Sequence, residues 1–108
     1  MLEKLTTGFS VGIITNMKAA NLINERHQIS DNAFIELVVW DVPTEVAGSD
    51  HQYKYRLALI VDQVCVMRYD NERGKGSHKH IGDEEIDYTF VDIKTLIDDF
   101  LKDVEELT

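Results

Sequence analysis

The sequence has little of several features, and each shortage excludes a class of protein. One cysteine among 108 residues cannot form an intrachain disulfide, which excludes a small secreted domain built on disulfides and makes a reducing cytoplasm the expected location. No run of about 20 apolar residues is present, so no helix is expected to cross a membrane. The short apolar patch at residues 9–14 also lacks the pattern of a secretion signal.

Positive charge is scarce as well, with 11 Lys and Arg against 20 Asp and Glu and a net charge of −9. Such a balance excludes a protein that coats nucleic acid or anionic lipid through bulk charge. The charges are nevertheless unevenly distributed. Residues 83–108 have ten acids and two lysines, whereas residues 63–82 have four cations and two acids. The sequence therefore predicts an acidic C-terminal segment, with its acids mostly on one helix, beside a locally basic segment.

Length and composition predict one α+β domain over residues 1–108. The chain is too short for two cores, and its 44% hydrophobic content is enough for one. Residues 18–90 are expected to form an antiparallel β-sheet of four to six strands, with residues 92–107 as one C-terminal amphipathic helix packed on a face. Residues 1–17 are expected to be an N-terminal extension or an edge strand.

Four segments have the apolar or β-branched composition of strands, namely residues 21–29, 34–40, 55–61 and 64–69. The second is almost wholly apolar, so we expect it to be covered on both faces and to end at Pro43. Only Asp62 and Gln63 separate the last two segments, which predicts a tight hairpin. Tyr88 and Phe90 are expected to form a short final strand.

The predicted helix has apolar residues every three or four positions from Ile93 to Leu107. Asp92 is the expected N-cap, because its short carboxylate can accept from the free amides of the first turn. The other face of this helix is acidic and is available to a basic partner. Its acids are Asp98, Asp99, Asp103, Glu105 and Glu106.

Residues 70–82 are expected to form the main loop, because they contain three glycines and begin with Asp-Asn. Cations in this region suit phosphate groups, and glycines let a backbone approach a ligand closely. The expected substrate-binding residues are Arg68, Arg73, Gly74, Gly76 and Lys79. The segment is therefore our candidate site for an anionic substrate.

Two histidines give this segment a potential chemistry, since imidazole can exchange a proton near neutral pH. Cleavage of RNA needs a base for the 2′-hydroxyl, an acid for the leaving oxygen and cations for the charged phosphorane. The expected catalytic residues are Tyr69, Asp70, Lys75, His78 and His80, with Tyr69 or Asp70 orienting an imidazole. This reaction requires neither a metal nor another cofactor.

Other interpretations of the same segment remain open. It could be a solvent-exposed connection, or it could pair with the acidic helix as a structural contact. His78 and His80 could instead bind a metal, with His27, His51 or an acid as the third ligand, in a metal-dependent enzyme. A non-enzymatic binding module is a further alternative.

Other individual residues have simpler expected roles. Trp40 is expected in the core rather than as a stacking platform, and Cys65 is expected to be a buried small hydrophobe. His51 is expected to be solvated. Tyr53 and Tyr55 alternate on one face of a strand and are expected in the core or at its rim.

Several stretches resemble the TumE family of toxin–antitoxin proteins. They are Trp40-Asp-Val-Pro43, Tyr53-Lys-Tyr-Arg-Leu57 and, most specifically, Tyr69-Asp-Asn-Glu-Arg-Gly-Lys-Gly-Ser-His-Lys-His80. The resemblance covers about residues 18–104. It departs from the family at Ser77, where Asp is common, and in residues 1–16, which precede the usual start.

This resemblance implies a small toxin that is neutralised by a DNA-binding helix-turn-helix antitoxin. Together with the chemistry of residues 70–82, it predicts a toxin that acts on RNA as a metal-independent ribonuclease. The expected partners are the antitoxin and RNA, a homodimer is compatible with the sequence, and no contact with a membrane is expected.

Overall fold

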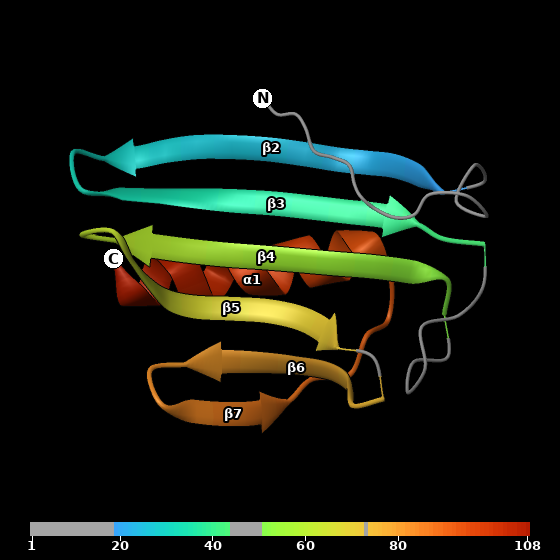
Figure 1. Cartoon of the computed structure of the whole chain (residues 1–108). Helices are drawn as coiled ribbons and strands as arrows, with labels where there is room; N and C mark the ends of the chain where they lie inside the picture. The colour runs from blue at the N-terminus through green and yellow to red at the C-terminus, as the bar shows by residue number, and fades with distance from the viewer. Residues whose placement is uncertain (1–18, 44–50, 73) are drawn as a thin grey trace.

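A computed structural model describes residues 19–43, 51–72 and 74–108. The expectations for residues 1–17 and for Arg73 lie outside these ranges. In the described part, six strands form one antiparallel sheet in sequence order, and one helix packs on it (Figure 1). The elements are β2 (Ala20–Ser30), β3 (Ala33–Asp41), β4 (Tyr53–Val61), β5 (Val64–Glu72), β6 (Gly76–Ile81), β7 (Glu84–Asp87) and α1 (Ile93–Leu107). The predicted α+β class is confirmed.

The sheet has one covered face and one open face. On the covered face, alternate strand residues such as Val39, Leu57 and Tyr69 are buried against Leu96 and Phe100 of α1. Alternation places every second side chain on the opposite side of the sheet. In Figure 1, α1 lies behind β4 and β5, and no described element lies in front of them. The expectation that residues 34–40 are covered on both faces is therefore wrong.

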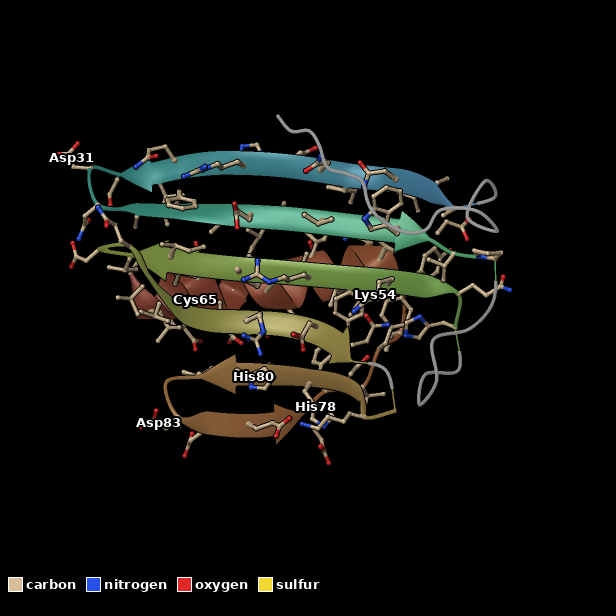
Figure 2. All side chains as sticks on the ribbon, viewed as in Figure 1. Asp31, Lys54, Cys65, His78, His80 and Asp83 are labelled. Atoms are coloured by element: carbon tan, nitrogen blue, oxygen red, sulfur yellow. The ribbon has the colours of Figure 1, made fainter. Side chains whose placement is uncertain are left out.

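The open face includes Trp40, Arg56, Arg68, His78 and His80, which alternate with residues of the covered face along their strands. Figure 2 looks onto this face and shows the two histidines on β6, between β5 and β7. Trp40 is 36% exposed, so its expected place in the core is also wrong. The apolar run in β3 could not reveal which side of the sheet lacks a covering helix.

The turn between β4 and β5 forms as predicted. Asp62 and Gln63 have positive φ values of 51° and 68°. Two consecutive residues of this kind give a turn whose twist matches that of the flanking strands. Cys65, just beyond it, is exposed rather than buried.

The prediction of a loop over residues 70–82 is wrong, because most of this segment forms β5 and β6. Asn71 is fully buried, and its side chain extends the pairing of β5 with β4. Its amide nitrogen donates to the Tyr53 carbonyl at 2.7 Å, and its amide oxygen accepts from the Tyr55 amide at 3.0 Å. The conformations that favour glycine occur at Gly74, Gly76 and Gly82, with φ values of 85°, 78° and 59°.

The last strand is also displaced from its predicted position. β7 ends at Asp87, and residues 88–90 lead to the helix without strand structure. Their aromatic side chains pack inward instead: the Tyr88 hydroxyl donates to Asp99 Oδ2 at 2.6 Å, and the Phe90 ring stacks on His51 at 3.9 Å between centroids. This contact also contradicts the expectation that His51 is solvated.

The helix begins and ends as predicted. Asp92 is its N-cap and accepts from the Thr95 amide at 2.7 Å. The acidic face of the helix is less available than expected, because two of its acids accept hydrogen bonds from tyrosines. Asp99 accepts from Tyr88, and Asp103 accepts from Tyr69. Four of the ten acids in residues 83–108 precede residue 88, in β7 and the turn before it, so the acidity is shared between a hairpin and the helix.

Candidate functional site

The strand register brings two histidines beside three carboxylates on the open face. His78 is paired with Asp70 of β5 and Asp87 of β7, and His80 is paired with Glu85 of β7. Residues opposite one another in antiparallel strands point to the same face. We call these five residues, Asp70, His78, His80, Glu85 and Asp87, the histidine–carboxylate cluster.

Glu85 lies between the two imidazoles of this cluster. Its Oε2 atom is 4.0 Å from Nε2 of His78 and 4.0 Å from Nε2 of His80. The two outer carboxylates complete the arrangement, since Asp87 Oδ1 is 3.2 Å from His78 Nε2 and Asp70 Oδ1 is 3.7 Å from His80 Nε2. Both imidazoles therefore direct the same ring nitrogen toward one small region.

The two histidines are accessible to different extents. The side chain of His78 is 13% exposed and that of His80 is 24% exposed, whereas the side chain of Asp87 is almost fully exposed. His78 is further held by a contact of 3.2 Å between its Nδ1 and the Gly76 carbonyl. The ring of His78 is therefore held in place, whereas that of His80 is the more accessible of the two.

Asp70 is the most buried acid of the cluster, with 8% of its surface exposed. Its Oδ2 atom accepts from Arg68 Nε at 2.7 Å. Its Oδ1 atom and His80 Nε2 are buried and have no hydrogen-bond partner among the described residues. Their separation of 3.7 Å is too long for a hydrogen bond. A carboxylate that orients an imidazole for proton transfer by Nε2 bonds Nδ1 of the ring. Asp70 faces Nε2 instead, so its hydrogen bond is to Arg68 and its charge lies beside the proton-transfer atom of His80.

Lys75 joins the cluster from the turn between β5 and β6. Its Nζ atom is 3.5 Å from Glu85 Oε2, and both side chains are substantially exposed. Ion pairs of this kind contribute little to stability because water screens them. A phosphate group could therefore replace the Glu85 carboxylate as the partner of Lys75 at small cost.

Two residues of the predicted site lie on the covered face, separated from the histidines by the sheet. The Tyr69 hydroxyl donates to Asp103 Oδ2 at 2.5 Å, and Lys79 Nζ is 3.0 Å from the same oxygen. Burial raises the pKa of Tyr69, and the hydrogen bond to Asp103 raises it further. Pairing of the basic segment with the acidic helix, one of the structural alternatives, is thus observed for Lys79.

Glu85 and Asp87 were missed as site residues by sequence reasoning. They belong to an acidic segment that resembled a solvated face, and only the register of β6 with β7 places them beside histidines. The alternation of acids with Ile86, directly after the turn at Gly82 and Asp83, is the pattern that could have indicated a strand.

A metal site receives no support from the described residues, among which no group of three or more His, Cys, Asp and Glu is arranged to hold an ion. Of the expected third ligands, the two histidines lie elsewhere, and the acid Glu85 lies 4.0 Å from both imidazoles. His27 is 2.7 Å from Glu25 on β2, and His51 is stacked on Phe90.

Fold and site together define a small α+β domain with a histidine–carboxylate cluster on an open sheet face. Residues 13–108 match the protein family described as Toxin TumE. The chain therefore belongs to the TumE toxin family, as its sequence resemblance predicted. It is the toxin component of a toxin–antitoxin system, with an antitoxin as its partner.

No curated protein and no solved structure gave a significant match to the chain. Within the described residues, no helix is long and apolar enough to cross a membrane.

Proposed function

We propose that this toxin cleaves RNA without a metal, with His78 and His80 as the proton-transfer pair. The observation that supports this most directly is the approach of both Nε2 atoms to within 4.0 Å of Glu85 Oε2 on the open face. Two imidazoles in one small region can act as base and acid in a single reaction.

The proposed reaction is an intramolecular transesterification. One imidazole removes the proton of a ribose 2′-hydroxyl, and the 2′-oxygen forms a bond to the adjacent phosphorus. The bond from phosphorus to the 5′-oxygen breaks, and the other imidazole, in its protonated form, gives a proton to that oxygen. The products are a 2′,3′-cyclic phosphate and a 5′-hydroxyl.

The neighbouring charges have separate tasks in this proposal. Arg68 and Lys75 flank the histidines and stabilise the doubly charged phosphorane, as cations do in phosphoryl-transfer sites. Asp70 holds Arg68 through one oxygen, and its other oxygen faces the proton-transfer nitrogen of His80. We further propose a helix-turn-helix protein as the antitoxin; a homodimer of the toxin remains a prediction that light scattering in solution can check.

The test is incubation of the purified toxin with total RNA, with and without EDTA. The proposal predicts cleavage in EDTA and its loss in His78→Ala and His80→Ala. His27→Ala is the matched control, because His27 is an exposed histidine of the same sheet whose partner is Glu25 and not the cluster. Cleavage by the control should equal that of the wild type.

Three outcomes contradict the proposal. Loss of cleavage in EDTA would indicate a metal-dependent enzyme. Full cleavage by both cluster variants would place the chemistry elsewhere. Growth arrest on expression without cleavage of any RNA would indicate a non-enzymatic binding module.

A further inference from the structure

We infer that the open face binds single-stranded RNA along a path from Trp40 to the histidines, with Trp40 as the platform on which a base stacks. The inference rests on the proposed function for the identity of the substrate as RNA. It adds that the RNA is single-stranded and that Trp40 helps to determine specificity. It replaces our sequence-based assignment of Trp40 to the core.

Trp40 lies at the end of β3 that carries the loop toward β4, on the open face. It is 36% exposed, while its neighbour Val39 on the covered face is fully buried. A large aromatic side chain on an uncovered sheet face presents a flat surface to solvent. Aromatic side chains on open sheets are a recurring means of stacking unpaired bases.

Cations lie on the strand next to Trp40, on the side toward the histidines. Lys54 of β4 is directly opposite Trp40, and Arg56 occupies the next position on the same face. Arg56 is 48% exposed and is 3.5 Å from Glu36, itself 36% exposed. An ion pair so long and so exposed is weak, so a phosphate can take the place of Glu36.

The register connects these cations to the cluster. Arg56 is opposite Asp70, and Asp70 is opposite His78, so one row of side chains leads from β4 to β6. Adjacent strands are about 4.8 Å apart, which makes the distance from β3 to β6 about 14 Å. A few nucleotides of extended single strand cover such a distance, as they do in single-strand binding grooves.

A duplex does not fit this path, because paired bases are already stacked on each other and cannot stack on Trp40. The proposed substrate is therefore an unpaired segment, and its affinity should depend on a base beyond the cleaved bond. Removal of one stacking side chain is expected to weaken binding about tenfold.

The test uses the fact that Trp40 is the only tryptophan of the chain, so fluorescence excited at wavelengths that tyrosine does not absorb reports on it alone. A 2′-O-methyl hexanucleotide, which lacks the attacking hydroxyl, is titrated into the full-length toxin. We expect quenching of the Trp40 emission that saturates with binding, and no quenching by the same sequence as a duplex. Fluorescence polarisation of a labelled hexanucleotide should give about tenfold weaker binding to Trp40→Ala.

Trp40→Phe and Val64→Ala are the companion variants. Phe keeps an aromatic surface and should retain most of the affinity, whereas Val64 is an exposed apolar residue at the β4–β5 turn, far along the sheet from Trp40, and its loss should change nothing. Matching far-ultraviolet circular dichroism and melting temperatures exclude misfolding of any variant. Equal binding by the wild type and Trp40→Ala, or unchanged fluorescence at saturation, would overturn the inference.

Cleavage separates this inference from the proposed function. If both hold, a hexanucleotide has a lower KM than a dinucleotide in the wild type, and Trp40→Ala loses only this length advantage. Quenching and weaker Trp40→Ala binding without any cleavage would reject the ribonuclease and keep the inference. Cleavage with the same length dependence in both proteins, or fluorescence that responds to the antitoxin but not to RNA, would reject the inference alone.

Discussion

The two faces of the sheet carry the same kinds of side chain, but the lengths of their contacts differ. On the covered face, Tyr69, Lys79 and Asp103 form short bonds of 2.5 and 3.0 Å. On the open face, His80 is 3.7 and 4.0 Å from its two carboxylates. Short bonds fix a structure, whereas the contacts of His80 are too long for hydrogen bonds and leave its Nε2 atom without a partner among the described residues. Because His78, Lys79 and His80 are consecutive, this difference is created by strand alternation alone.

Among residues that do not themselves transfer a proton, Asp70 is expected to have the largest effect. Asp70→Asn keeps the size of the side chain but removes the charge that holds Arg68 and faces His80. A hydrogen bond to a charged group typically contributes about 1.5–3 kcal/mol, which corresponds to about 10–100-fold in rate. We expect cleavage of RNA to fall by that factor, with a changed pH profile and little change in KM. Glu84→Gln, which alters an exposed acid of β7 outside the cluster, is the control. A pH profile identical to that of the wild type would show that Asp70 does not act through a histidine.

On the covered face, Tyr69→Phe should reduce stability and leave the chemistry unchanged. The substitution removes a hydrogen bond to a charged oxygen in a buried site, which typically costs about 1.5–3 kcal/mol. Urea denaturation should show this loss, while the rate of RNA cleavage per folded molecule stays at the wild-type value. A large loss of cleavage would show that Tyr69 contributes to catalysis, as the sequence analysis expected.

Stability should fall at alkaline pH because of the covered face. Burial and hydrogen bonds to Asp103 and Asp99 raise the pKa values of Tyr69 and Tyr88, and burial raises that of Tyr55. Above about pH 10 an unfolded tyrosine loses its proton while these folded ones keep theirs. The unfolded chain then binds fewer protons, so the free energy of unfolding decreases as pH rises, and it is at its full value below pH 10.

Absorbance of tyrosinate and circular dichroism, followed together from pH 8 to 12.5, check this expectation. Ionisation of three of the four tyrosines should coincide with unfolding. Ionisation of all four in a chain that remains folded would contradict the assignment.

The smallest effect is expected at Glu36 on the open face. Its ion pair with Arg56 is long and exposed, so Glu36→Gln should change the free energy of unfolding by less than about 0.5 kcal/mol. The same change frees Arg56 and should slightly strengthen binding of single-stranded RNA at low salt. Clear destabilisation would show that the open face is held together more firmly than its distances indicate.

The local parts of the fold were predictable from the sequence. Asp92 caps its own helix, and Asp62 and Gln63 form their own turn, so neighbouring residues determine both. The shared face of His78 and His80 was also predictable, because alternation in an extended chain requires it. These features depend on sequence spacings of a few residues.

The remaining parts depend on residues far apart in the chain. Asn71 resembled the start of a loop, but its bonds to residues 53 and 55 make it the end of a strand. Glu85 becomes a site residue only through pairing with His80. Trp40 is exposed because, in the part of the chain that the structure describes, the single helix packs on the opposite face of the sheet. Composition could not show any of these contacts in advance.

The central claim is that the chemistry belongs to the open face of β6, and one pair of variants tests it most directly. Rates of RNA cleavage in EDTA are compared for His80→Ala and Lys79→Ala, which alter adjacent residues on opposite faces of the same strand. We expect the rate of RNA cleavage to fall at least about 100-fold in His80→Ala and to stay near the wild-type rate per folded molecule in Lys79→Ala. Equal rates in the two folded variants would contradict it.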